Sequence, residues 1–406
     1  MPKDPAPLNP LPDSESPVLR RLSERPAQDA AGLGRRMLFF TGGSALDSAS
    51  RALKHYTHNS VHLVTPYDSG GSSAILRQAF GMPAIGDLRS RLMSLADDRA
   101  TGHPEGVKLF AHRLPTDAAS SALRVELDSI VRGEHALVKA VDLHNRNLIC
   151  VQLAAFREAM PEDFDLRGAS IGNLVLTGTW LRNARDLDSA IAEFAQYAAV
   201  LGEVHTVTND NYHLMAQLSD GSRVLGEHRI TGLDLARRGL RIERFGLSQS
   251  QEDYHPVTSL LPESRRQMIA AAQMICFPPG SFYTSVLANL LPRGAGRAIA
   301  ATQVPKVFVP SLGGDPEQAG LTLTESVERL LGVLREDCGS GTPNSRLLSH
   351  VVLDSRRGRY NGGIDASALK ALGVEVLERP LVSAGSAPLA DAQLLVEALL
   401  SVPLQR

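Results

Sequence analysis

The feature that most constrains the fold of this chain is a repeated unit: a short apolar strand, a loop of glycine and hydroxyl residues, and then a helix. Residues 37–40 (MLFF) run into Thr41-Gly42-Gly43-Ser44, after which apolar residues recur at helical spacing. Residues 61–64 (VHLV) run into a second such loop, at residues 68–73 (DSGGSS), and a second helix. Repeated units of this kind imply a parallel sheet with helices packed on its faces.

Two segments interrupt the alternation of strands and helices. Residues from about 91 to 165 carry apolar residues at helical spacing without strand-like alternation, which predicts a helical insertion. Residues 213–218 and 223–228 flank Ser219-Asp220-Gly221-Ser222, and an Asp-Gly dipeptide between such runs indicates a β-hairpin. Residues 232–258 are polar, and we expect them to be irregular.

Five later apolar runs complete the predicted sheet, and two helix starts carry capping signals. Asp188 is expected to cap one helix, and Thr322 forms a capping box with Glu325 before another. We therefore predict a doubly wound α/β fold with a mostly parallel, Rossmann-like sheet, a helical insertion and a β-hairpin. The five runs are residues 203–208, 274–277, 306–309, 350–353 and 374–377.

Composition divides the chain into a tail and one domain. Residues 1–36 are rich in proline and lack apolar periodicity, so we expect a disordered tail there and a single domain over 37–406. The 42 basic and 44 acidic residues give a net charge of -2, which argues against general binding to nucleic acid or anionic membranes. No apolar run reaches the ~18 residues of a membrane span, and the N-terminus lacks a signal-peptide core. We therefore expect a cytoplasmic protein.

Missing motifs exclude several chemistries. The sequence has no GxxxxGK[ST] motif, no GxGxxG after the first strand and no HExxH. These absences argue against a P-loop nucleotidase, a nicotinamide-dependent enzyme and a zinc protease. The three cysteines lie far apart with no CxxC pair, which is typical of reduced thiols rather than metal ligands. We expect no zinc, haem or nicotinamide cofactor.

Three loops at predicted strand ends share one chemical character, because glycines and small hydroxyls come directly before a helix in each. Glycine lets backbone N–H groups approach an anion closely, and the helix N-terminus adds positive potential. Tight packing between strand and helix is an alternative explanation for such loops. The candidate phosphate-binding residues in them are Gly42, Gly43, Ser44, Gly70, Gly71, Ser72, Ser73, Gly280, Ser281, Tyr283, Thr284 and Ser285.

Charged residues gather around the second loop. Asp68 precedes its glycines, Arg77 lies in the following helix, and Asp87 and Arg89 open the next element. Arginine forks suit a diphosphate, and carboxylates suit a hydrated Mg²⁺, for which Asp68 is the candidate ligand. Helix capping by Asp87 and salt bridges among these side chains explain the same residues equally well.

Five motifs resemble the signatures of the CofD/YvcK family and occur in the same order along the chain. Residues 64–77 (VTPYDSGGSSAILR) are similar to V-T-V-A-D-D-G-G-S-S-G-R-L-R, and residues 86–89 match G-D-L-R. Residues 172–176 (GNLVL) are similar to G-N-L-L-L, residues 208–214 to T-x-E-D-V-H-L, and residues 279–285 (PGSFYTS) to P-G-S-L-Y-T-S. The resemblance extends from about residue 37 to the C-terminus.

The resemblance implies one of two functions. CofD enzymes are 2-phospho-L-lactate transferases, which move phospholactate from a nucleotide diphosphate donor onto a deazaflavin with Mg²⁺. YvcK-type proteins resemble them in fold, bind UDP-N-acetylglucosamine and act in carbon metabolism and cell shape. Residues 279–285 are nearer the YvcK form. The resemblance thus implies a nucleotide diphosphate or nucleotide sugar as ligand, with Asn173 contacting a polar edge and Tyr283 packing on base or sugar at the pocket rim.

Departures from the family pattern keep the question of catalysis open. The second aspartate of the family signature is Ser69 here, which removes half of a carboxylate pair that could hold metal. We expect a binding protein with a regulatory role in carbon or envelope metabolism. A Mg²⁺-dependent transferase and a scaffold that has lost its pocket stay as alternatives. A homodimer is compatible with the sequence.

Overall fold

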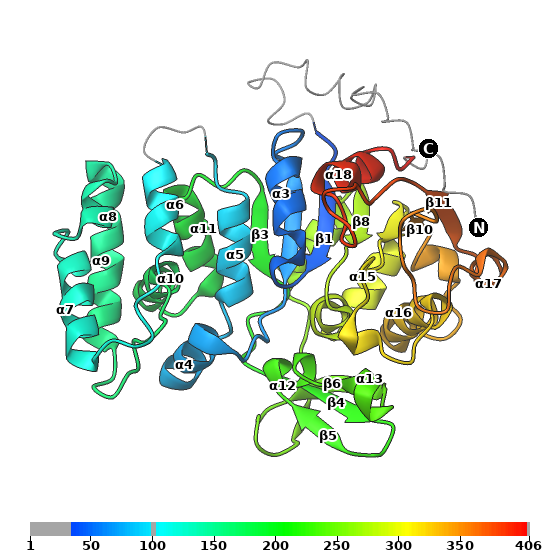
Figure 1. Cartoon of the computed structure of the whole chain (residues 1–406), viewed down its shortest axis with the longest axis horizontal. Helices are drawn as coiled ribbons and strands as arrows, with labels where there is room; N and C mark the ends of the chain where they lie inside the picture. Colours follow the sequence, from blue (N-terminus) through cyan, green and yellow to red (C-terminus); the bar gives the residue numbers. More distant parts are fainter. Residues whose placement is uncertain (1–33, 99–102, 404–406) are drawn as a thin grey trace, which may run out of the picture.

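A seven-stranded parallel sheet runs through the middle of the molecule (Figure 1). The structure is a computed structural model that describes residues 34–98 and 103–403. The strand order is β11-β10-β9-β8-β1-β2-β3, which is the doubly wound order of Rossmann-like folds. The strands are β1 (Met37–Thr41), β2 (Ser60–Val64), β3 (Glu203–Thr206), β8 (Met274–Phe277), β9 (Lys306–Phe308), β10 (His350–Leu353) and β11 (Glu375–Glu378). The predicted fold class is confirmed.

The central strands are apolar runs because both faces of the sheet are covered. Every residue of β1, β2, β8 and β10 is buried, as expected for a parallel sheet between helical layers. The predicted capping box is present at the start of α16, where Thr322 and Glu325 bind each other's backbone. The helices flanking the sheet are α3 (Asp47–Leu53), α5 (Gly86–Ser94), α14 (Glu263–Ala271), α15 (Ala295–Ala301), α16 (Leu323–Cys338), α17 (Ala366–Ala371) and α18 (Ala392–Leu400).

The long connection between β2 and β3 forms the helical insertion at the left of Figure 1. Its helices share an apolar core of their own, in which α10 is buried along almost its whole length. The cap of α11 is Asp186, not Asp188 as expected; Asp188 lies in the first turn and binds Arg265 instead. The helices are α4 (Gly71–Phe80), α6 (His103–Ala111), α7 (Ser120–Val131), α8 (Ala136–Lys139), α9 (Leu143–Ala159), α10 (Ile171–Arg182) and α11 (Leu187–Tyr197).

A small antiparallel sheet lies below the central sheet in Figure 1. The predicted hairpin forms its first two strands, β4 (His213–Leu218) and β5 (Arg223–Leu225). The expectation of an irregular segment over 232–258 is wrong, because β6 (Ile242–Ser248) and β7 (Pro256–Val257) lie within it. Burial along β6 does not alternate, so its residues carry no strand-like pattern. Two short helices complete this unit: α12 (Glu227–Thr231) and α13 (Leu235–Arg238).

Residues 1–33 of the predicted tail lie outside the described residues, and the division into tail and single domain stays a prediction. No helix in the described parts of the chain combines the length and the apolar character needed to cross a membrane.

Candidate functional site

A buried arginine orients the first loop. The guanidinium of Arg91 donates to the carbonyl oxygens of Gly42 (3.5 Å) and Gly43 (3.1 Å) and pairs with Asp47 (3.2 Å). A trans peptide unit points its C=O and N–H in opposite directions, so the N–H groups of Gly43 and Ser44 face away from Arg91. The loop therefore presents amide donors at the carboxyl end of β1, where doubly wound sheets bind ligands.

The second loop leads into α4, whose N-cap residue, Gly70, has no capping side chain. Asp68 lies just before it and accepts a hydrogen bond from Gly70 N (2.9 Å). Gly71 has a φ of +48° and open space beyond its Cα atom, so a side chain would be strained but would meet no neighbour. Ser72 Oγ accepts from Asn173 Nδ2 (3.4 Å), which ties the loop to α10. The first turn of α4 is thus open to a ligand.

Three carboxylates lie close together beside these loops. A methyl group on Gly86 would lie 2.8 Å from Asp68 Oδ2, and one on Gly43 would lie 3.3 Å from Asp87 Oδ1. Burial raises the pKa of Asp87 to about 7, and the negative charges of Asp68 and Glu227 add to the rise. Burial also raises the pKa of Glu227. Sequence reasoning missed Glu227, because the small sheet brings it to the site from a distant part of the chain.

Oxygen donors of this kind fit Mg²⁺, which takes carboxylates and keeps several waters. A cation there would relieve the repulsion among Asp68, Asp87 and Glu227. Ser69, at the position of the family's second aspartate, instead holds α12: its hydroxyl contacts Nδ1 of His228 (2.8 Å) and accepts from His228 N (3.2 Å). More carboxylates therefore surround Asp68 than the sequence comparison indicates.

Arg77 is not free to bind phosphate, which corrects the expectation from the sequence. Its side chain is 5% exposed, and all three guanidinium nitrogens are engaged by protein groups. These partners join the end of β2 to the segment before β4, so Arg77 fastens two loops together. They are the carbonyl oxygens of Tyr67, Asp68 and Tyr212, the side-chain oxygen of Asn211, and Nε2 of His213.

Of the two candidate arginines, Arg89 is the one available to a ligand. Its Nε donates to Asn173 Oδ1 (3.2 Å), which orients the guanidinium. Among the residues that the structure describes, no group accepts a hydrogen bond from its two terminal nitrogens. Burial lowers the pKa of Arg89, and the nearby Arg113 adds to this effect. A cation that is partly desolvated and only partly bonded gains from an anionic ligand.

The third loop differs from the expectation, because internal carboxylates already occupy its amides. Phe282 N donates to Asp315 (2.6 Å), while Tyr283 N and Thr284 N both donate to Glu317 (2.9 Å). Thr284 Oγ1 also donates to Glu317 (2.6 Å). Burial raises the pKa of Glu317, and the charge of Asp315 adds to the rise. The two acids thus take the place expected for phosphate, so Thr284 is not a phosphate ligand.

Tyr283 lies in the core and not at a pocket rim. Its side chain is 0% exposed, its hydroxyl donates to Ile242 O (3.1 Å), and its ring packs edge-on against Phe245. A methyl group on Gly42 would lie 2.3 Å from Ser285 Oγ, so the third loop touches the first loop through Ser285. Gly280 N donates to Ser311 (3.2 Å), while Ser281 and Ser285 are partly exposed.

An open cavity of about 650 Å³ adjoins the second loop. Polar side chains from α4, α12 and the small sheet line it, including Ser69, Asn211, His228, Gln249 and Gln251. A larger cavity of about 830 Å³ lies between the small sheet and α16, and none of the candidate residues lines it. The geometry therefore points to the first and second loops together with the smaller cavity.

Comparison with known proteins decides the family. The sequence profile of the family described as 2-phospho-L-lactate transferase CofD matches residues 37–382. The chain belongs to the CofD family. Its resemblance to this family, expected from the loop motifs, is thereby confirmed.

Two relatives of this chain are named as gluconeogenesis factors. The chain is 27% identical over 355 residues to the gluconeogenesis factor of Bacillus subtilis, covering 86% of this chain and 91% of that protein. It is 28% identical over 298 residues to a putative gluconeogenesis factor of Nostoc sp., covering 73% of this chain and 52% of that longer protein. A crystal structure of a UPF0052 family member from Bacillus halodurans aligns with a TM-score of 0.64 at 25% identity, over 91% of this chain and 100% of that one.

Proposed function

We propose that this CofD-family protein binds a nucleotide diphosphate or a nucleotide sugar similar to UDP-N-acetylglucosamine, and that it regulates carbon or envelope metabolism. The observation that carries the proposal is the convergence of the first loop, the uncapped start of α4 and the guanidinium of Arg89. Oriented amides and one available arginine are what a diphosphate requires. The names of the relatives support the regulatory role.

The diphosphate would lie between the first two loops. The N–H groups of Gly43 and Ser44 would donate to one phosphate, and those at the start of α4 to the other. The guanidinium of Arg89 would offset the negative charge of the two phosphates. Because Asp68, Asp87 and Glu227 would repel an anion, Mg²⁺ held by Asp68 should accompany the ligand. The cavity beside Ser69 lies within the range of about 300 to 1,000 Å³ typical of ligand pockets, and its amide side chains suit the polar edge of a base.

One observation favours the alternative function, a 2-phospho-L-lactate transferase type of reaction. Burial and neighbouring charges raise the pKa of Asp87 to about 7, the range suited to a general base at neutral pH. In that reaction the acceptor hydroxyl would give its proton to Asp87 and bond to phosphorus, while the phosphoanhydride bond to the nucleotide breaks. Binding and catalysis would then use the same loops.

Isothermal titration calorimetry with UDP-N-acetylglucosamine, UDP and GDP, with and without Mg²⁺, tests the proposal. We expect Mg²⁺-dependent binding to at least one nucleotide, and Arg89→Ala should weaken it by ~10-fold or more, since charged hydrogen bonds contribute about 1.5 to 3 kcal/mol. Arg132→Ala removes an exposed charge at the end of α7, in the helical insertion, and serves as the control. Arg77→Ala should instead lower the melting temperature.

The outcome separates the alternatives. The absence of binding by any of these nucleotides at millimolar concentration would contradict the proposal and favour a scaffold without a ligand. Release of nucleoside monophosphate in the presence of a deazaflavin acceptor, lost in Asp87→Asn, would establish the transferase instead.

A further inference from the structure

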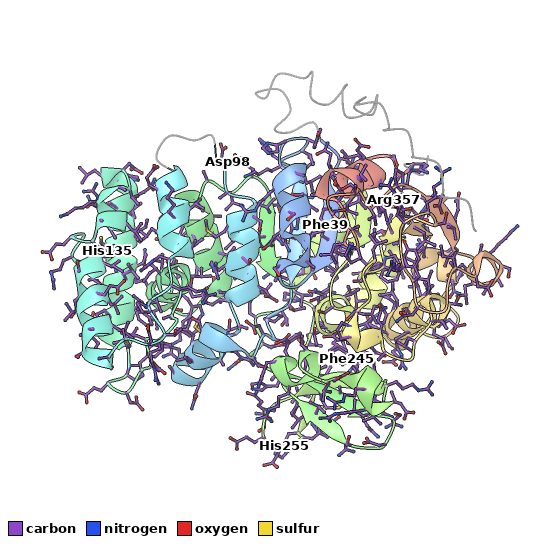
Figure 2. The ribbon with its side chains drawn as sticks, in the orientation of Figure 1. Phe39, Asp98, His135, Phe245, His255 and Arg357 are labelled. Atoms are coloured by element: carbon purple, nitrogen blue, oxygen red, sulfur yellow. The ribbon has the colours of Figure 1, made fainter. Side chains whose placement is uncertain are left out.

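Three metal-ligating side chains meet in the helical insertion. His112 follows α6 directly, Glu126 lies in α7, and His135 precedes α8 as its N-cap. One ligand atom from each of the three lies within 4.8 Å of the other two. His112 Nε2 is 3.0 Å from Glu126 Oε1. Figure 2 shows His135 in the insertion, on the opposite side of the molecule from Arg357 and well away from the small sheet.

Local structure holds the three side chains in position. The carbonyl oxygen of His112 accepts a hydrogen bond from Ile171 N (2.9 Å), which anchors the end of α6 to α10. His135 N donates to Ser129 O (3.2 Å), which fixes the turn between α7 and α8. Glu126 lies in the middle of the 12-residue helix α7. The backbone therefore presents the ligands from three anchored segments, as preorganised metal sites do.

We propose that His112, Glu126 and His135 bind a divalent transition metal, with Zn²⁺ as its best-fitting ion. Two imidazoles and one carboxylate are a ligand set found in zinc sites, and they leave a fourth tetrahedral position for water or another ligand. The side chains of His112 and Glu126 are 27% and 26% exposed, so an ion can reach them from solvent. Mg²⁺ prefers oxygen donors and does not compete well for imidazole.

The metal replaces weaker contacts that the three side chains make with protein groups. The contact between His112 Nε2 and Glu126 Oε1 exchanges for two metal–ligand bonds. His135 Nδ1 accepts from Leu137 N at 3.3 Å, so a metal on Nε2 moves the ring proton to Nδ1 and gives up this long hydrogen bond. One such bond contributes only about 1 kcal/mol, far less than a bound Zn²⁺.

No motif in the sequence indicates this site, and we expected no zinc. Zinc signatures are read from short spacings such as CxxC or HExxH, whereas these ligands lie at positions 112, 126 and 135 on separate segments. The site is independent of the proposed nucleotide site, which depends on the loops after β1 and β2. A bound ion would fasten α6, α7 and α8 to one another.

Zinc titration of the full chain tests the site. The protein is purified without a histidine tag, treated with a chelator, and titrated with Zn²⁺ against a chromophoric zinc chelator. We expect one Zn²⁺ per chain, and Co²⁺ should give the visible absorption of a four-coordinate site. His112→Ala, His135→Ala and Glu126→Gln should each weaken zinc binding by more than ~10-fold. Even the loss of a residue that only hydrogen-bonds to a metal ligand weakens metal affinity by about this much. His144→Ala, an exposed histidine of α9, is the control and should change nothing.

Two results would overturn the proposal. One is no zinc uptake at a tenfold molar excess of Zn²⁺, and the other is equal zinc affinity in the wild type and the folded Glu126→Gln and His112→Ala variants. Glu126→Gln keeps the size of the side chain, so it covers the case in which a histidine variant does not fold. Melting curves recorded without metal confirm that the variants fold. Nucleotide titration of the same samples shows whether the zinc-site variants leave nucleotide binding unchanged.

Discussion

At the scale of single residues, Asp87 shows how position sets chemistry. Its folded-state pKa of about 7 lies above the ordinary value of 3.8, because burial and the charges of Asp68 and Glu227 disfavour the carboxylate. The folded protein therefore holds this proton more tightly than the unfolded chain does. The resulting stabilisation is fully present below about pH 4 and is lost as the pH rises towards 7.

Asp87→Asn removes this proton linkage. We expect the variant to melt at a higher temperature than the wild type at pH 8, with the difference shrinking towards pH 5. Thermal denaturation of the ligand-free proteins from pH 5 to 8 measures it. Asp117→Asn, at an exposed acid between α6 and α7, provides a comparison. A difference between Asp87→Asn and wild type that stays constant with pH would show that Asp87 titrates normally.

Tyr283 should contribute to stability and not to ligand binding. Its ring is buried and its hydroxyl donates to Ile242 O, so Tyr283→Ala should lower the free energy of unfolding by ~3 to 5 kcal/mol. Tyr283→Phe removes only the hydrogen bond and should cost about 1 kcal/mol. Urea denaturation gives both values. If Tyr283→Phe keeps its stability but loses nucleotide affinity, the residue belongs to the pocket after all.

At the scale of elements, the backbone N–H groups of the third loop stabilise the fold instead of binding a ligand. Glu317 accepts hydrogen bonds from Tyr283 N and Thr284 N, which are the kind of donors that bind phosphate elsewhere. We expect Glu317→Ala to lower the unfolding free energy by at least ~2 kcal/mol, since hydrogen bonds to a charged group contribute about 1.5 to 3 kcal/mol each.

Hydrogen–deuterium exchange over residues 282–286 reports the loosening of this turn directly. Glu328→Ala, at an exposed acid of α16, should leave this exchange unchanged. Slow exchange at residues 282–286 in Glu317→Ala would mean that the turn holds its shape without the carboxylate, contrary to this account.

The sequence predicted the elements whose signals are local. Apolar runs identified the buried strands, the Asp-Gly dipeptide identified the hairpin, and Thr322 with Glu325 identified the start of α16. Strand β6 was missed because its burial does not alternate. Two nearby acids compete for the cap of α11, and the sequence does not separate Asp186 from Asp188.

The role of a site residue was predictable only where its interaction partners lie in the same sequence motif. The glycine loops after β1 and β2 follow from the sequence, because strand ends and helix starts lie side by side. Glu227 reaches the site through the small sheet, and Glu317 reaches the third loop from 33 residues away. The roles of Arg77 and Tyr283 depend on such long-range contacts, so a motif match does not reveal them.

At the scale of the whole molecule, the strand order places the candidate site. Connections run in opposite directions from β1 and β8, which opens a crevice at their carboxyl ends. The small sheet lies at the same end of the central sheet as α4, and α12 contacts the second loop through Ser69 and His228 (Figure 1). The helical insertion lies to the other side and provides Asn173, which orients Arg89.

The central claim is that the nucleotide binds at the first two loops and not in the larger cavity beside α16. Hydrogen–deuterium exchange measured with and without UDP-N-acetylglucosamine and Mg²⁺ tests it most directly, because it locates the ligand along the chain. We predict slower exchange in peptides covering residues 42–47, 69–77 and 86–90. Slower exchange confined to residues 241–247 and 325–336, with none at the loops, would contradict the account.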